Sequence, residues 1–311
     1  MAHPNIALIK YWGKSDARLN LPKSPSISLT LDGFKTSTSV TVKRHLKEDV
    51  FILNGKEIQN DKINTLMDQV RHLADVPFHA VIETANNFPT SAGYASSASG
   101  MAALSVACNK AYRLNLDHDG IAQLARIGSG SATRSIDGGL VTWQPGSDKS
   151  SFGKQILPPE KVPIAVLSIT TTSNQKSISS TSAMKVVSNN SPFYDAWIQS
   201  STIDFENALN CIQNEKWEKL LEISEHNAMK MHATTISAKP AIFYFEPETI
   251  QIIKLITKIR QEKKLSVYCS IDAGPNVKIL TFQSQLDSVM RELQSWHPEV
   301  SLPGKGARII E

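Results

Sequence analysis

A stretch of small side chains from Asn86 to Leu104 constrains the fold more than any other part of the chain. It reads NNFPTSAGYASSASGMAAL and follows a predicted strand over 79–84. A tight turn of small residues that enters a helix leaves backbone N–H groups unpaired at the positive end of the helix dipole. Such a turn is an anion site, most often for phosphate. A Ser-rich turn packed closely on a sheet is the alternative of equal weight.

Composition indicates a soluble globular protein of one large or two modest domains. The 311 residues are 41% hydrophobic and 20% charged, with no apolar run that could span a bilayer. The N-terminus lacks the pattern of a secretory signal. A net charge of +4 from dispersed Lys and Arg suits small anions and does not indicate nucleic acid. Since Cys108, Cys211 and Cys269 form no CxxC pair, we expect neither a zinc site nor a disulfide framework, and a cytoplasmic location.

Hydrophobic periodicity predicts an α+β protein. The first 55 residues are mostly strand, and we expect Asn60 or Asp61 to cap the helix that follows. From Phe193 onward the chain becomes helix-rich, and Pro247 suits the first position of a helix. We expect a surface loop over 144–161 and a closing strand over 307–310.

Three further stretches carry candidate site residues. The run KYWGK over 10–14 ends a predicted strand, where loops commonly build sites. The alternative is that its aromatic side chains simply pack in the core and its lysines are solvated. Arg134 lies in a segment rich in Gly and Ser, and its planar fork suits a carboxylate or phosphate unless it is simply solvated. Asp272 follows a strand over 267–271 and is either a turn-capping residue or a positioned acid/base.

Four motifs, in this order, resemble those of the diphosphomevalonate decarboxylase family in the GHMP superfamily of small-molecule kinases. They are NIALIKYWGK over 5–14, NNFPTSAGYASSASG over 86–100, GSGSATRSIDGG over 128–139 and IDAGPN over 271–276. The phosphate-loop motif by itself indicates the superfamily, whereas YWGK and the GSGSxxR loop indicate the family. The resemblance covers essentially the whole chain.

The resemblance implies an α+β, GHMP kinase-like fold of two domains with the active site between them. An N-terminal domain over 1–172, resembling ribosomal protein S5 domain 2, would carry the ATP phosphate loop. A helix-rich, ferredoxin-like domain over 173–311 would carry the catalytic aspartate. Family members are commonly homodimers that need Mg²⁺.

The implied reaction converts (R)-5-diphosphomevalonate and ATP into isopentenyl diphosphate, ADP, phosphate and CO₂, in isoprenoid synthesis. No nucleic acid or membrane partner is expected. The alternatives are a 5-phosphomevalonate decarboxylase, a GHMP kinase that phosphorylates a mevalonate derivative without decarboxylating it, and a binding protein that has lost catalysis.

The family pattern also implies site residues. Asp272 matches the catalytic aspartate, Lys14 would steer it, and Arg134 would hold the substrate carboxylate. The substrate-binding positions are Tyr11, Trp12, Gly13, Lys14, Lys62, Ser129, Gly130, Ser131, Ala132, Thr133, Arg134 and Thr181. The ATP-binding positions are Ala92, Gly93, Ser96 and Ser97. The pattern assigns no metal ligand.

Overall fold

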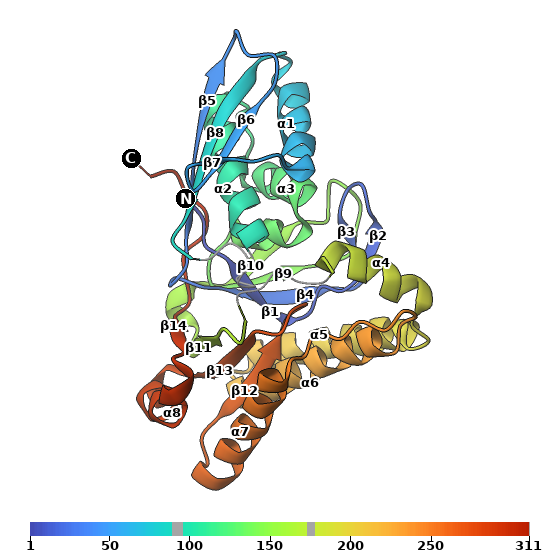
Figure 1. The fold of residues 1–311 in the computed structure, drawn as a ribbon, viewed down its shortest axis with the longest axis vertical. Coiled ribbons are helices and arrows are strands. Elements are labelled where there is room, and N and C mark those ends of the chain that lie inside the picture. Colours follow the sequence, from blue (N-terminus) through green and yellow to red (C-terminus); the bar gives the residue numbers. More distant parts are fainter. Residues whose placement is uncertain (89–95, 173–177, 311) are drawn as a thin grey trace.

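The computed structural model describes residues 1–88, 96–172 and 178–310 (Figure 1). Its strands are β1 (Asn5–Ile9), β2 (Lys14–Asp16), β3 (Leu21–Pro22), β4 (Ser26–Thr30), β5 (Thr36–Lys43), β6 (Val50–Leu53), β7 (Lys56–Glu57), β8 (His79–Asn86), β9 (Leu140–Trp143), β10 (Gly153–Leu157), β11 (Ile164–Ile169), β12 (Val267–Ile271), β13 (Val277–Phe282) and β14 (Glu299–Ser301).

The α-helices are α1 (Asp61–Ala74), α2 (Ser96–Ala111), α3 (His118–Gly128), α4 (Ser180–Asn190), α5 (Tyr194–Gln213), α6 (Trp217–Ile236), α7 (Pro247–Lys263) and α8 (Leu286–Leu293). The 3₁₀ turns are η1 (Gly130–Ser135), η2 (Pro159–Lys161), η3 (Gln283–Gln285) and η4 (Gln294–Trp296). Within the described ranges, none of these helices has both the length and the apolarity needed to cross a membrane.

Helices α1, α2 and α3 cover one face of a sheet with the strand order β5-β8-β6-β7 (Figure 1). Strand β8 alternates in burial, so Ala80 and Ile82 point into the core. They pack with Leu66 and Met67 of α1 in one buried cluster. This cluster supports the helix ends that reach the cavity described below.

The C-terminal half is built on a second sheet, with the order β12-β13-β11-β14. Ile252, Ile256 and Ile259 form the buried stripe of α7 and pack in one cluster with Val267 of β12 and Ile279 of β13. Helix α7 thereby covers the strand that leads to the predicted catalytic aspartate.

Strand β1, in a third sheet of order β1-β4-β9-β10, connects the two halves. Its Ile6 and Leu8 pack with Phe205 of α5 and Leu220 of α6. Ser270 Oγ on β12 also donates to the Ala7 carbonyl at 3.2 Å. These contacts bring the end of β1 beside the end of β12.

Local signals predicted several element ends correctly. Of the two candidate caps, Asn60 caps α1, since its side chain accepts a hydrogen bond from the Lys62 N–H at 3.0 Å. Pro247 is the first residue of α7. These two predictions are confirmed because both signals act within a few residues of the helix end.

Two predictions were wrong. The expected loop over 144–161 contains β10, and its pairing with β9 is a tertiary effect that the polar composition of the segment hides. The expected strand over 307–310 is irregular, and β14 at Glu299–Ser301 pairs with β11 instead. A domain boundary at residue 172 stays a prediction; it would assign β11 to the N-terminal domain, although both sheet partners of β11 are C-terminal strands.

Candidate active site

A cavity of about 850 Å³ lies where the ends of β1, α1, α2, α3, α4 and β12 converge. Twelve of the predicted site residues line it: Tyr11, Trp12, Lys14, Lys62, Ser96, Ser97, Ser129, Gly130, Ser131, Arg134, Thr181 and Asp272. Three described candidates, Gly13, Ala132 and Thr133, are not among its lining residues. Ala92 and Gly93 lie outside the described residues.

Lys10 and Asp272 form an ion pair at this cavity. Lys10 Nζ lies 2.7 Å from Asp272 Oδ1 and donates a second hydrogen bond to Ser270 Oγ at 2.7 Å. The lysine side chain is 2% exposed and the aspartate side chain 37%. Burial lowers the pKa of Lys10, although the Asp272 carboxylate opposes the shift. The lysine is therefore enclosed by protein, and the carboxylate faces the cavity.

The sequence assigned the steering of Asp272 to Lys14, but the two side chains form no ion pair in the described structure. Lys14 Nζ instead donates to Asn20 Oδ1 at 2.5 Å. The local motif KYWGK contains both lysines, and only the path of the chain after β1 decides which of them meets β12. Lys10 is thus the main residue that sequence reasoning missed.

Arg134 is 2% exposed and is held by polar groups of two strands. Nη1 donates to Ser26 Oγ on β4 at 2.7 Å, and Nη2 donates to Asn5 Oδ1 on β1 at 3.4 Å. Nε has no partner within the described structure. Burial lowers the pKa of Arg134 to about 10. A buried guanidinium whose Nε–H is unused can bind an anionic group in the cavity.

Asn5 also orders the loop that carries Arg134. Its Nδ2 donates to the Ser131 carbonyl at 3.1 Å and to Ser135 Oγ at 2.8 Å. Because the amide nitrogen faces these acceptors, Oδ1 must face the guanidinium. The sequence motif contains Asn5, yet a role for it was not predicted, because an asparagine inside a strand gives no local signal of a distant partner.

Two lysines add positive charge on the α1 side of the cavity. Burial lowers the pKa of Lys14, and the nearby Lys62 ammonium lowers it further. Burial also lowers the pKa of Lys62. Two partly buried ammonium groups that repel each other favour an anion between them.

The side chains of Tyr11 and Trp12 form part of the cavity wall. The Tyr11 ring lies 4.7 Å from the Trp143 ring between centroids. The buried Tyr11 hydroxyl has no partner within the described residues, and burial raises its pKa. A Cβ atom on Gly130 would lie 2.8 Å from that hydroxyl oxygen, so only glycine fits there.

Gly13, Ala132 and Thr133 support the wall instead of facing the cavity. Gly13 has φ +118°, and a Cβ atom there would lie 1.8 Å from the Tyr194 hydroxyl. Ala132 is fully buried. Thr133 Oγ1 accepts a hydrogen bond from the Gly153 N–H at 2.8 Å.

Ser96 and Ser97 open α2, and no acidic residue lies in the first turn of that helix. A helix N-terminus without carboxylates suits phosphate oxygens. The described residues contain no group of three or more His, Cys, Asp or Glu side chains arranged for a metal. Mg²⁺ that accompanies ATP is commonly held largely through phosphate oxygens and water. The N-terminus of α2 offers a site for the phosphates of such a nucleotide.

Solved structures share this architecture. The mevalonate diphosphate decarboxylase of Enterococcus faecalis is 40% identical with a TM-score of 0.92, over 98% of this chain and 96% of that one. The Staphylococcus aureus enzyme is 37% identical with a TM-score of 0.93, over 100% and 96%. A complex described as MDDEF with MVAPP, AMPPCP and magnesium is 40% identical with a TM-score of 0.94, over 100% and 97%. Fold and site thus define an α+β protein of the two-domain, GHMP kinase-like class.

Residues 2–153 match the diphosphomevalonate decarboxylase-like N-terminal domain, and residues 165–305 match the mevalonate 5-diphosphate decarboxylase C-terminal domain. The chain belongs to the diphosphomevalonate decarboxylase family. The diphosphomevalonate decarboxylase of Candida albicans, for example, is 34% identical over 308 residues, which cover 92% of this chain and 84% of that protein. Family membership confirms the enzyme class, an ATP-dependent decarboxylase.

Proposed function

We propose that this chain decarboxylates (R)-5-diphosphomevalonate with ATP, releasing isopentenyl diphosphate, ADP, phosphate and CO₂ for isoprenoid synthesis. One observation carries the proposal: the Lys10–Asp272 pair and the unused Nε of Arg134 meet in a single cavity. The substrate has a tertiary alcohol at C3, a carboxylate nearby and a diphosphate at its far end. The cavity supplies an acid/base group and two separate cationic regions for these features.

Asp272 acts on the C3 hydroxyl. Its carboxylate accepts the hydroxyl proton while the oxygen receives the phosphoryl group of ATP, a role that needs a fixed base within hydrogen-bond reach. After that proton has passed on to a phosphate oxygen or to solvent, the ionised carboxylate stabilises positive charge at C3 as the new phosphate leaves. Lys10 holds Asp272 in one orientation from its buried position.

Arg134 holds the substrate carboxylate. Its position on η1 is fixed by Ser26 and Asn5, so little entropy is lost when the anion binds. A planar guanidinium can keep the carboxylate in line with C3 by a paired contact. As the C–C bond breaks, its electrons form the double bond to C3 and CO₂ departs.

Lys14 and Lys62 bind the diphosphate end, and Ser96 and Ser97 at the start of α2 bind ATP phosphate oxygens. Thr181 on α4 also lines the cavity and contacts the substrate. Bound Mg²⁺ supplies charge stabilisation to the transferring phosphoryl group.

The test is a coupled measurement of ADP and CO₂ with 5-diphosphomevalonate and, in parallel, 5-phosphomevalonate. We expect equal amounts of ADP and CO₂ with the diphosphate and much slower turnover with the monophosphate. ADP without CO₂ would establish a kinase that stops at the phosphorylated product. Binding of Mg-ATP with no turnover on either compound would establish a binding protein.

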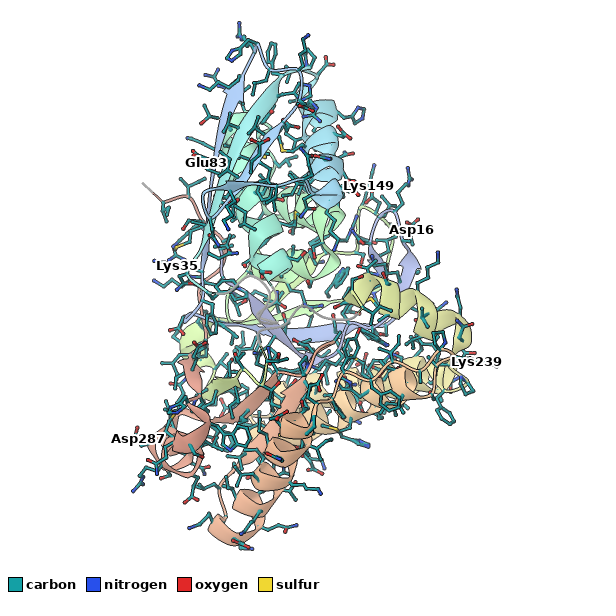
Figure 2. The ribbon with its side chains drawn as sticks, viewed as in Figure 1. Asp16, Lys35, Glu83, Lys149, Lys239 and Asp287 are labelled. Carbon is teal, nitrogen blue, oxygen red and sulfur yellow. The ribbon has the colours of Figure 1, made fainter. Side chains whose placement is uncertain are left out.

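We also propose a cytoplasmic homodimer. Phe193 and Ile236 are 56% and 41% exposed, and the hydrogen bond between Ser191 and Ser237 at 2.8 Å holds their chain segments together. Lys239, labelled in Figure 2, marks this end of the molecule.

All three cysteines are free and buried, which suits a reducing compartment. Light scattering on the purified protein measures the mass, and fractionation of cells locates it.

A further inference from the structure

Asn20 contacts Lys14 from outside the residues assigned above. It ends the turn between β2 and β3, lines the cavity and has φ +53°. Its Oδ1 accepts the hydrogen bond from Lys14 Nζ at 2.5 Å. Its Nδ2 donates to the carbonyls of Arg126 at 3.0 Å and Ile127 at 2.9 Å. One short side chain therefore connects the lysine to the end of α3.

The orientation of this amide follows from its partners. A carbonyl can only accept hydrogen bonds, so both amide protons of Asn20 must point to Arg126 and Ile127. These two carbonyls belong to the last turn of α3, where helix geometry leaves them without intrahelical partners. Since the nitrogen is committed to the helix end, Oδ1 must face Lys14.

The acceptor offered to Lys14 is neutral, and this matters for the charge of the cavity. A carboxylate in the place of the amide would hold the ammonium equally well but would cancel its charge. No carboxylate within the described structure forms an ion pair with Lys14. The amide thus orients the ammonium and leaves its full charge for an anionic ligand.

The turn itself is held from both sides. Leu19 N–H donates to Asp16 Oδ1 at 2.8 Å, and the Leu19 carbonyl accepts from Arg126 Nε at 3.0 Å. Asp16 is labelled on this hairpin in Figure 2. Arg126 is fully buried, so its guanidinium has little freedom to move. The turn that carries Asn20 is therefore held in place, and Asn20 can orient the Lys14 ammonium.

We propose that Asn20 is a positioning residue that aims the Lys14 ammonium at the phosphorylated end of the substrate. The proposal rests on the proposed function, because it needs an anionic substrate beside Lys14. It assigns Asn20 no contact with the reacting atoms. The predicted consequence is an effect on KM for the phosphorylated substrate and not on kcat.

The test is a double-mutant cycle with Asn20→Gly and Lys14→Met. Glycine keeps the positive φ of residue 20 and removes only the side chain. We expect Asn20→Gly to raise KM for 5-diphosphomevalonate about tenfold, as loss of one hydrogen bond to a charged group does, with kcat within about twofold. In the Lys14→Met background the same change should leave KM unaltered, because Asn20 acts through Lys14.

If Asn20 acted only as a structural cap of α3, the Tm and the pattern of KM changes would differ from those expected above. If Asn20 only caps the helix, Asn20→Gly lowers the Tm and raises KM by the same factor in both backgrounds, which overturns the proposal. Asn115→Gly is the matched control, because Asn115 also has φ +53°, is exposed and does not line the cavity. It should leave KM unchanged.

Asn20→Asp provides a second variant of nearly the same shape. Its carboxylate would neutralise Lys14, so we expect a rise in KM at least as large as with glycine. An unchanged KM in this variant overturns the proposal even if Asn20→Gly fails to fold. A wild-type enzyme with no activity on 5-diphosphomevalonate would contradict the proposed function, whereas an active wild type with an additive cycle would contradict only the role of Asn20.

Discussion

Lys10 Nζ and Asp272 Oδ1 lie 2.7 Å apart although 262 positions separate them in the sequence. Lys10 follows β1 in the N-terminal half, and Asp272 follows β12 in the C-terminal half. The pair therefore exists only when the two halves are packed together. It ties the integrity of the domain contact to the acid/base chemistry of the cavity.

The two lysines of the KYWGK motif should have separable effects. We expect Lys10→Met to lower kcat about 10²-fold or more, because Asp272 loses the group that orients it. We expect Lys14→Met to act mainly on KM, because the proposed role of Lys14 is to bind the diphosphate end of the substrate. Steady-state kinetics on both variants measures the split, and a larger loss of kcat in Lys14→Met would restore the steering role that the sequence assigned to Lys14.

Asp272→Asn should separate nucleotide binding from turnover. The amide has the shape of the carboxylate but cannot accept a proton in its place, so we expect kcat to fall on the order of 10²–10⁴-fold. Mg-ATP affinity, measured by titration calorimetry, should stay within about threefold of the wild type. Near-normal turnover would contradict the assignment of Asp272.

Arg134→Lys keeps the charge but loses the planar fork. We expect kcat/KM to fall at least about 10²-fold, because a lysine cannot replace the contact with Ser26 and also pair with a carboxylate. The unfolding free energy of this variant, measured by urea titration, reports any loss of packing separately. Activity close to that of the wild type would show that charge alone suffices at this position.

Gly13→Ala should destabilise the protein through a clash. The added Cβ would meet the Tyr194 hydroxyl at 1.8 Å, and φ at residue 13 is +118°. We expect the unfolding free energy to fall by more than about 2 kcal/mol. Gly55→Ala is the control, because residue 55 has φ +78° but no heavy atom within 4 Å of the added Cβ.

The control Gly55→Ala should lower the unfolding free energy by about 1 kcal/mol, because it adds backbone strain without a clash. Addition of Tyr194→Phe to Gly13→Ala removes the offending oxygen and should recover part of the lost stability. Equal losses at Gly13 and Gly55 would contradict a steric role for Tyr194.

His232 should make the protein sensitive to acid. It is buried beside Ile271, whose carbonyl lies 3.2 Å from its Nε2, and burial lowers its pKa to about 4. Between pH 6.5 and pH 4 the unfolded chain binds a proton at this residue and the folded chain does not. Stability from this source is therefore present above pH 6.5 and decreases as the pH falls, by up to about 2 kcal/mol at pH 5.

Urea unfolding at pH 7 and pH 5 tests this effect. His232→Gln, which retains an N–H donor for the Ile271 carbonyl, should remove most of the difference between the two pH values. His226→Gln, on an exposed face of the same helix, should not. An unchanged pH dependence in His232→Gln would mean that other groups cause the acid sensitivity.

Much of the fold could be predicted from local patterns. The cap at Asn60, the start of α7 at Pro247 and the strands β1, β12 and β13 follow from signals that lie within each element. Most of the predicted site residues do line the cavity, because each family motif is a short segment with its own backbone conformation. Strand β10 was missed because its pairing with β9 depends on another segment.

The sequence by itself determined which chemical groups this protein brings to its site: small residues before α2, Arg134, Asp272 and two lysines four positions apart. Only the tertiary structure decided how they pair. Lys10 meets Asp272 and Lys14 meets Asn20. The physical reason is that an ion pair in a buried site needs a distance of a few ångströms and full hydrogen bonding. That distance is set by the packing of β1 against α6 and β12, and no spacing within the KYWGK motif encodes it.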